Sequence, residues 1–265
     1  MVFVIDNIKL SVRTPSFLFL YINTNIYIKM KNLNIFSSVT EYENAKSGGG
    51  ILNVPNVSFV DEDSSVRYLL ENIPTHNGYE YVDLGLPSGL KWATCNVGAN
   101  SPEQAGLYFA WGETTGYTSK QVPDVRAFTE DEYKAGPAAS ISADLTLEQD
   151  AAHVNLGGNW RMPTKDECQE LLDNCDDSWT DGYNGTDVAG WVLTSKVNGK
   201  SVFFPAAGDC CNSNVWGVGS NGEYQSAMRD SYSTKLAWFL DFGSMGHGVS
   251  SSPRCLGRSV RGVFK

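Results

Sequence analysis

The sequence is poor in the residues that most enzymes and nucleic-acid-binding proteins need. Its 265 residues include only three histidines, and its 20 basic residues are outnumbered by 30 acidic ones. The chain has no run of Lys and Arg, although binding to a phosphate backbone needs such clusters. We therefore predict that the protein has no nucleic-acid partner.

The spacing of histidine and cysteine gives no sign of a metal centre or an activated nucleophile. None of the six cysteines forms a CxxC pair, and no Cys/His group has zinc spacing. The histidines His76, His153 and His247 are scattered, and none lies in a setting typical of a catalytic triad. We predict a protein that is not an enzyme and binds no cofactor.

One acidic segment offers an alternative to that prediction. Residues 173–187 are rich in oxygen donors, which calcium prefers as ligands. The segment lacks the final glutamate of an EF-hand loop, so we interpret it as a solvated acidic loop and keep calcium as the lesser alternative.

The GVGSNG stretch at residues 217–222 matches G-x-G-x-x-G, but no βαβ pattern surrounds it, so we predict a glycine-rich turn.

No apolar run of the chain is long enough to cross a bilayer. The apolar residues 17–22 are too few, and they lack the basic start and the cleavage site of a signal peptide. We expect synthesis in the cytoplasm without a clear signal and without membrane insertion. Met30 is a second possible translation start. We therefore interpret residues 1–29 as upstream sequence that is read in frame, or as a disordered segment.

Residues 30–75 predict a small N-terminal module. Apolar residues on both sides of the acidic turn at residues 61–63 favour a hairpin. The module also holds a glycine-rich joint at residues 47–50. A linker near residues 73–78 then leads into the main domain, residues 79–265.

The main domain is predicted to be α+β, with short antiparallel strands and two helices. One helix is expected near residues 147–154. The other follows Pro163, where Thr164 and Glu167 match a capping box. Asn198-Gly199 between two strand-like runs predicts a two-residue type I′ hairpin. Most tryptophans lie beside glycine or in apolar runs and are expected in the core, whereas Trp216 and Tyr224 are expected at the surface.

Several ordered strings of the main domain resemble one family. YVDLGLPSGLKWATCNVGA, GLYFAWGET, LEQDAAHVNLGGNWRMPTKDECQELL, FFPAAG and GRSVRGVF are similar to the Fibrobacter succinogenes major paralogous domain, over about residues 79–264. The resemblance implies a C-type lectin-like fold, allied to formylglycine-generating enzymes, whose first and last strands pair. It also implies a ligand surface on the irregular segments between the late strands.

In related variable proteins, diversity-generating retroelements change this C-terminal region. The resemblance therefore implies a receptor-binding display protein of a Bacteroidetes phage or bacterium, carried on a phage tail or cell surface. Its partners would be a protein or glycan receptor on a target cell and, through the N-terminal module, a structural protein of the virion or surface. The oligomeric state, including a homotrimer, is left open.

The retroelement mechanism supplies a codon test. Mutation of the adenines in an asparagine codon can produce many residues, but not Trp, Met, Gln, Lys or Glu. Residues 243–258, GSMGHGVSSSPRCLGR, are expected to be a display loop in which Met245 is a fixed exception. The predicted ligand surface comprises Asp209, Cys210, Cys211, Asn212, Asn214, Trp216, Tyr224, Phe239, Asp241, Gly243, Gly246, His247, Gly248, Ser250, Ser251, Ser252, Cys255 and Leu256.

Within this set, Phe239 and Asp241 are expected to share one face of a strand. Arg254 and Arg258 are further candidates, Arg254 as a contact residue and Arg258 by the codon test. Two other functions remain as alternatives. One is a fixed surface lectin or adhesin. The other is a copper oxidase of the formylglycine-generating kind, in which Cys255 would need a partner thiol that the sequence does not identify.

Overall fold

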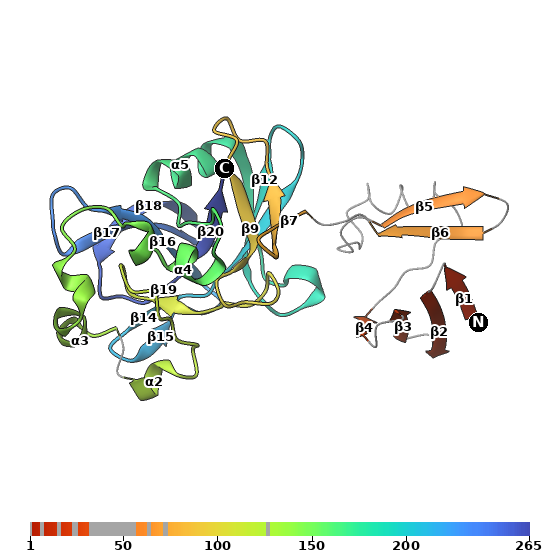
Figure 1. Ribbon diagram of the computed structural model, residues 1–265, viewed down its shortest axis with the longest axis horizontal. Coiled ribbons are helices and arrows are strands. Elements are labelled where there is room, and N and C mark those ends of the chain that lie inside the picture. The colour runs from red at the N-terminus through yellow and green to blue at the C-terminus, as the bar shows by residue number, and fades with distance from the viewer. Residues whose placement is uncertain are drawn as a thin grey trace. The chain divides into compact units, whose positions relative to one another are not determined.

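The computed structural model describes six strands between residues 2 and 70, and then residues 74–125 and 128–265. The chain divides into two compact units, Met1–Ile73 and Pro74–Lys265. Figure 1 shows the elements of both units along the chain.

The described residues of the N-terminal unit form two antiparallel arrangements of strands. The first is a meander of β1 to β4, with bounds Val2–Ile5, Ile8–Thr14, Phe17–Ile22 and Ile26–Lys31. These described residues form strands where we expected upstream or disordered sequence, and a translation start at Met30 stays a prediction.

The second arrangement is the hairpin expected around the acidic turn. Strand β5 (Val57–Glu62) pairs with β6 (Ser65–Leu70), so that Glu62 lies opposite Ser65. The glycine-rich joint at residues 47–50 lies outside the described residues.

The second unit is a mixed α/β domain that is mostly β-sheet. One sheet has the order β20-β9-β8-β7, and a larger one has the order β10-β19-β16-β17-β18. A third sheet consists of β11, β12 and β13, and β14 pairs with β15. The strand bounds are Thr75–His76 (β7), Tyr79–Asp83 (β8), Lys91–Asn96 (β9), Tyr108–Phe109 (β10), Cys175–Thr180 (β11), Gly190–Ser195 (β12), Ser201–Pro205 (β13), Asp209–Cys211 (β14), Asn214–Trp216 (β15), Asn221–Arg229 (β16), Leu236–Gly243 (β17), Gly246–Pro253 (β18), Arg258–Ser259 (β19) and Arg261–Phe264 (β20).

The first and last strands of this unit meet in one sheet. Strand β20 pairs antiparallel with β9, which in turn pairs with β8 (Figure 1). Arg261 on β20 is fully buried; it donates to Asn96 Oδ1 at 2.8 Å and to the carbonyl oxygen of Phe203 at 3.0 Å. The Arg261 guanidinium thus connects the sheet that contains β9 with the sheet that contains β13.

The helices among the described residues are short. They are α2 (Val122–Val125), α3 (Glu130–Ala135), α4 (Ala151–Leu156) and α5 (Lys165–Asn174). The helix expected at residues 147–154 begins instead with a 3-10 turn, and α4 starts at Ala151. Helices α2 and α3 were not predicted, since segments of four and six residues carry little periodicity.

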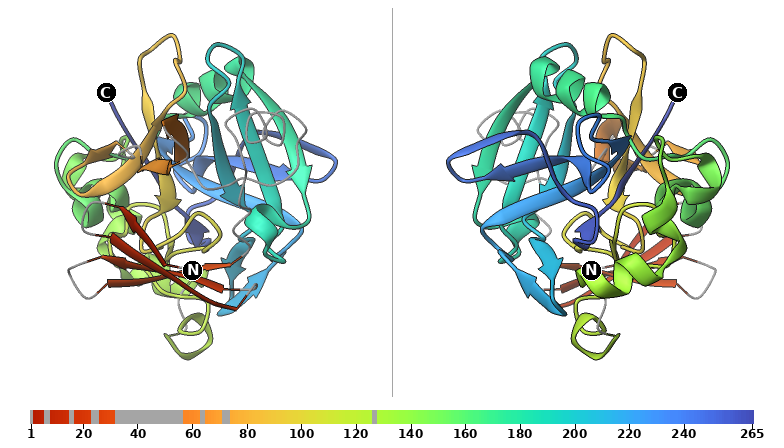
Figure 2. Two further views of the ribbon diagram at one scale, coloured as in Figure 1. Left: turned by 90° about the vertical axis from the view of Figure 1, so that its right-hand side faces the viewer. Right: turned by 90° about the vertical axis from the view of Figure 1, so that its left-hand side faces the viewer.

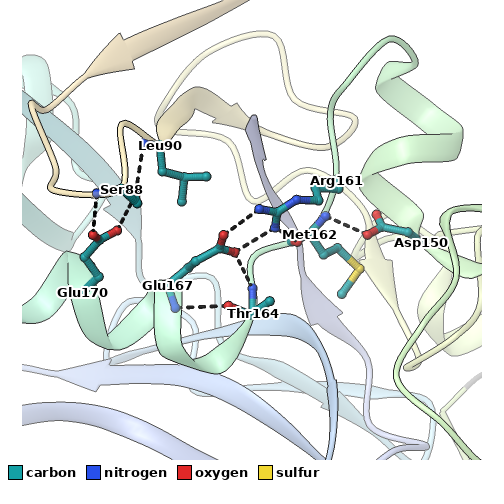
Figure 3. A network of polar contacts seen from close by, with 8 residues as sticks. All are labelled: Ser88, Leu90, Asp150, Arg161, Met162, Thr164, Glu167 and Glu170. Carbon is teal, nitrogen blue, oxygen red and sulfur yellow. Dashed lines mark hydrogen bonds and ion pairs between the residues drawn. The ribbon is translucent and has the colours of Figure 1, made fainter. Parts of the chain in front are cut away.

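The capping box of α5 is confirmed and belongs to a larger polar network, drawn in Figure 3. Thr164 Oγ1 accepts from the Glu167 amide at 3.2 Å, and the Thr164 amide donates to Glu167 Oε2 at 2.8 Å. Arg161 donates to both carboxylate oxygens of Glu167. One turn later, Glu170 accepts from the amide and the hydroxyl of Ser88. These contacts fix the helix against the loop before β9.

The core is aromatic, as the sequence predicted. Trp92, Trp111, Trp160 and Trp191 are each at most 2% exposed. In Figure 2 the teal strands β11–β13 cross the blue strands β17 and β18. Trp191 of β12 stacks on Phe242 of β17 with ring centroids 5.1 Å apart. This packing supports one face of the late strands and leaves their other face available for a site.

Strands β12 and β13 form the hairpin expected around residue 199, but the loop between them is not the predicted type I′ turn. Strands β12 and β13 are joined by residues 196–200, which is longer than a two-residue turn. Gly199 has a φ of 69°, whereas a type I′ turn would also need a positive φ at Asn198. Ser195 Oγ accepts from the amides of Val197 and Asn198 and so stabilises the longer loop.

Candidate functional site

The segment expected to be a display loop contains a strand. Strand β18 pairs with β17 residue for residue, from Gly243 opposite Gly246 to Leu236 opposite Pro253. The two strands are joined by Ser244 and Met245, and Met245 is fully exposed. The prediction of irregular structure was therefore wrong for residues 246–253: backbone pairing with the apolar strand β17 orders them although their own side chains show no pattern.

The register places the candidate residues on two faces of this hairpin. Residues directly opposite each other in an antiparallel pair have side chains on the same side. Asp241 lies opposite Gly248, and Phe239 lies opposite Ser250. On its other edge, β17 places Asp241 opposite Glu223 of β16. The expectation that Phe239 and Asp241 share a face is confirmed.

We call this side of the sheet the polar face. It is formed by Glu223 and Gln225 of β16, Phe239, Asp241 and Gly243 of β17, Gly246, Gly248, Ser250 and Ser252 of β18, and Arg258 of β19.

Arg258 holds the polar face together. Its Nε donates to Glu223 Oε2 at 2.6 Å, and its Nη2 donates to the Ser252 hydroxyl. The guanidinium carbon lies 4.0 Å from the centre of the Phe239 ring. Arg258 is only 1% exposed, so its charge depends on Glu223 for compensation. Separately, Ser250 Oγ donates to Asp241 Oδ1 at 3.0 Å.

Asp209 on β14 lies close enough to this face to be influenced by its charges. Burial raises the pKa of the Asp209 carboxyl, and the negative charge of Glu223 raises it further, while Arg258 acts in the opposite direction. Gly208 bridges to Gly222 on β16, which brings the start of β14 against the same sheet. The structure therefore brings Asp209 together with the polar face.

His247 and Ser251 lie on the opposite side of the hairpin. His247 faces β11 and β12, with Nδ1 at 3.7 Å from Asp177 Oδ2 and its ring 4.5 Å from that of Trp191. The indole nitrogen of Trp191 donates to the same Asp177 oxygen at 3.0 Å. Ser251 lies opposite Trp238. The predicted surface is thus divided by the sheet, and these two residues do not join the polar face.

A second group of candidates surrounds the β14–β15 hairpin. Asn212 and Asn214 are exposed, and Trp216 is 59% exposed, which agrees with its expected position. Cys210 and Gly257 exchange backbone hydrogen bonds of 2.7 and 2.9 Å, and this bridge places the hairpin next to the segment that follows β18. Cys255 and Leu256 in that segment are half-buried.

Several candidates are buried and cannot be surface contacts. Tyr224 is 2% exposed and donates from its hydroxyl to the Pro205 carbonyl at 2.7 Å, so its predicted exposure was wrong. Cys210 is 0% exposed. Phe239 is 6% exposed and lies beneath the Arg258 guanidinium. Arg254 is 2% exposed, and its guanidinium lies over the Trp111 ring. Residues 222, 224, 225 and 226 of β16 are all buried, so the strand has no strict alternation that would have marked Tyr224 as a core residue.

The glycines of the polar face have room for side chains. Among the described residues, a Cβ at Gly246 would meet no atom within 4 Å, and one at Gly248 would meet only Asp241 Oδ1 at 3.7 Å. Gly243 is tighter, with the Ser220 carbonyl oxygen at 3.3 Å. None of the three has a φ in the left-handed region, so their backbone accepts any L-residue.

Three glycines that are not in the candidate set have no room for a side chain. Gly208 has a φ of 69°, and a Cβ there would overlap the Trp216 carbonyl oxygen. A Cβ at Gly222 would overlap the Phe242 ring. A Cβ at Gly257 would lie 2.6 Å from Phe128. Sequence reasoning had not used this distinction between exchangeable and obligatory glycines.

The other motifs have ordinary structural explanations. In GVGSNG, Gly217 and Gly219 have positive φ and β16 begins at Asn221, so the prediction of a turn is confirmed. The acidic segment 173–187 consists of the end of α5, strand β11 and a 3-10 turn at Tyr183–Gly185. Among residues 74–125 and 128–265, no three metal-ligating side chains are grouped in a way that would hold a metal ion.

Comparison of the chain with protein-family models, curated proteins and solved structures finds no significant match. Within the described part of the chain, no helix has the length and hydropathy needed to cross a membrane.

Proposed function

We propose that residues 79–265 form a ligand-binding domain of the C-type lectin-like kind, similar to the Fibrobacter succinogenes major paralogous domain. Its polar face and the adjoining β14–β15 hairpin would be a variable surface, changed by a diversity-generating retroelement. The protein would present this surface on a phage tail or cell surface to a protein or glycan receptor.

The observation that carries the proposal is the contrast between two sets of glycines. Gly246 and Gly248, which pass the asparagine-codon test, have open space and ordinary backbone angles. At Gly208, Gly222 and Gly257, neighbouring atoms leave no room for a Cβ. A surface built for variation needs this combination, since substitutions on the outside must leave the frame unchanged.

The charges of the polar face favour a particular kind of partner in this variant. The carboxylates of Glu223 and Asp241, together with that of Asp209 on the adjoining β14, outnumber the single guanidinium of Arg258, and the hydroxyls of Ser250 and Ser252 lie beside them. Complementary partners would present hydroxyl or basic groups. Trp216, beside Asp209 in the β14–β15 ladder, would add an exposed aromatic contact.

The cysteine thiols give little support to the alternative of a copper oxidase. Burial raises the pKa of Cys255, and it raises that of Cys210 well above the usual range. A reactive cysteine needs a lowered pKa, because the thiolate is the nucleophile and metal ligand. Burial thus acts against thiolate formation at both residues.

The proposal can be tested with single substitutions of matched kind. Gly248→Tyr and Ser250→Tyr should leave the melting temperature within about 3 °C of the parent, because both residues are partly exposed on the polar face and Gly248 has room for a Cβ. Gly222→Tyr should prevent folding or lower the melting temperature by more than 10 °C, roughly, because its ring would collide with Phe242. Equal damage at residues 222 and 248 would refute an exchangeable surface.

Binding is tested by a library in which residues 241, 246, 248, 250 and 252 are encoded by NNY codons. The full chain would be displayed and selected on intact bacterial cells and on immobilised glycans. The proposal predicts enriched clones that differ only at these positions and bind different targets. A folded library from which no binder can be selected would contradict a ligand-binding role for this face.

A further inference from the structure

Strand β18 lies at the edge of the five-stranded sheet. Among the described residues, it pairs with β17 on one side and with no strand on the other. Successive residues of a strand direct their backbone N–H and C=O groups to alternate sides. Because Gly243 and Gly246 flank the tight turn of the hairpin, they and every second pair after them exchange hydrogen bonds between the two strands. The backbone groups of His247, Val249 and Ser251 therefore point away from β17.

These outward backbone groups are accessible. Within residues 74–125 and 128–265, the backbone hydrogen bonds of turns, loops and isolated bridges include none to residues 247, 249 or 251. None of the eight residues of β18 is buried. An exposed row of backbone N–H and C=O groups is a template on which another strand can pair.

Strand β18 also lacks the features that protect an exposed edge. Proteins block such edges with charged side chains, interior prolines, bulges or very short strands. The β18 sequence GHGVSSSP contains no Lys, Arg, Asp or Glu, and its proline is the last residue. Its pairing with β17 has no register shift, unlike the pairing of β17 with β16. The edge is therefore continuous along the whole strand.

We propose that two copies of this chain associate through β18, which pairs antiparallel with β18 of the second copy about a two-fold axis at Val249. In this register Val249 lies opposite its own copy, and His247 lies opposite Ser251 of the second copy. All three outward residues are then used, with two hydrogen bonds for each opposed pair. A second copy fits this edge because the strand is complementary to itself. A foreign peptide would instead need pockets for its alternate side chains.

The charge of the polar face does not oppose this contact. The chain has a net charge of −10, but β18 itself carries no acidic or basic residue apart from His247. On the neighbouring strand β17, the polar face carries Asp241. This carboxylate would lie three strand spacings, about 14 Å, from its copy. The Debye length at physiological ionic strength is about 8 Å, so salt screens most of this repulsion.

Pairing through β18 would place the two polar faces side by side. Gly248 would lie opposite Ser250 of the second copy, and both side-chain positions would stay on the same side of the continuous sheet. Because the contact is made by backbone groups, exchange of these side chains would leave it in place. The pairing does not depend on the proposed binding function. If the polar face binds a receptor as proposed, the dimer would present two copies of the site, and avidity would raise the apparent affinity.

Sedimentation velocity of the full chain tests the pairing, at concentrations from about 1 to about 100 μM because a small interface gives a weak dimer. The average mass should approach twice that of one chain as the concentration rises. Ser251→Pro removes one outward N–H without removing a hydrogen bond to β17, so this variant should stay monomeric. The control is Ser250→Lys, which changes the polar face of the same strand and should still dimerise.

A charge exchange at Val249 tests the register. Val249→Lys alone and Val249→Glu alone should each be monomeric, because like charges would lie directly opposite each other at the two-fold axis. An equimolar mixture of these two variants should recover the dimer, since opposite charges then face each other. Circular dichroism identifies the variants that are folded, and Ser251→Pro decides if the Val249 variants are not.

Three results would overturn the proposal. The first is a parent chain that stays monomeric at the highest concentration. The second is an association that survives in folded Ser251→Pro, which would assign the contact to another surface. The third is a mixture of folded Val249 variants that stays monomeric. Because no ligand is used, these outcomes are separate from any failure of the proposed binding function.

Discussion

Removal of the Glu223 carboxylate is the most informative perturbation of the polar face. Arg258 is 1% exposed, and its Nε lies 2.6 Å from Glu223 Oε2, which gives the buried guanidinium its charge partner. Within residues 74–125 and 128–265, Arg258 Nη1 has no hydrogen-bond partner. Glu223→Ala would therefore leave a buried charge without compensation.

The expected cost follows from the geometry. Loss of one partner from a buried ion pair destabilises a protein by about 3–5 kcal/mol. The side chain of Glu223 is 21% exposed, so water screens part of the interaction, and we take the lower end, about 3 kcal/mol. For a domain of this size each kcal/mol lowers the melting temperature by about 2–4 °C, so the expected decrease is roughly 6–12 °C.

The assay is thermal unfolding of the full chain, with a matched variant as control. Glu130→Ala removes the partner of Lys134 from an ion pair in which both side chains are more than half exposed. Exposed pairs contribute little, so its melting temperature should change by less than about 2 °C. If Glu223→Ala were as mild as Glu130→Ala, Arg258 would not be the anchor of the polar face.

Two further perturbations test the site and its frame. Burial and Glu223 raise the pKa of Asp209, so its ionised form is unfavourable in the folded state. Asp209→Asn should therefore raise the melting temperature at pH 7, and this gain should disappear as the pH falls below the pKa of Asp209; a loss of stability at pH 7 would contradict the assignment. Thr164→Ala removes the cap of α5 and should lower the free energy of unfolding by about 1 kcal/mol in chemical denaturation. The control is Thr114→Ala, because Thr114 accepts a hydrogen bond from Asn155 through its backbone carbonyl, which the substitution keeps.

Local signals in the sequence predicted local structure well. The capping box of α5 is formed by residues three positions apart, and the hairpin at residues 57–70 follows from apolar runs around an acidic turn. Both depend on short-range chemistry that the sequence displays directly. The α+β class followed from the same kind of pattern.

The polar face could be predicted only in part, because it depends on contacts between distant residues. Strand β18 has no apolar alternation of its own, and its structure comes from pairing with β17. The ion pair of Glu223 and Arg258 joins residues 35 positions apart. The burial of Tyr224 requires β16 to lie between β17 and β19, and this strand order is not visible in the sequence.

The most direct test of the central claim is to sequence the 3′ end of this gene across a population of the same strain or phage, together with the surrounding DNA. The proposal predicts a neighbouring reverse-transcriptase gene and a near-copy of the 3′ end that differs only at adenines. Substitutions should concentrate at residues 241, 246, 248, 250 and 252, and the codons for Gly208, Gly222 and Gly257 should stay unchanged. An invariant 3′ end without a template copy would contradict diversification and would leave a fixed surface-binding domain.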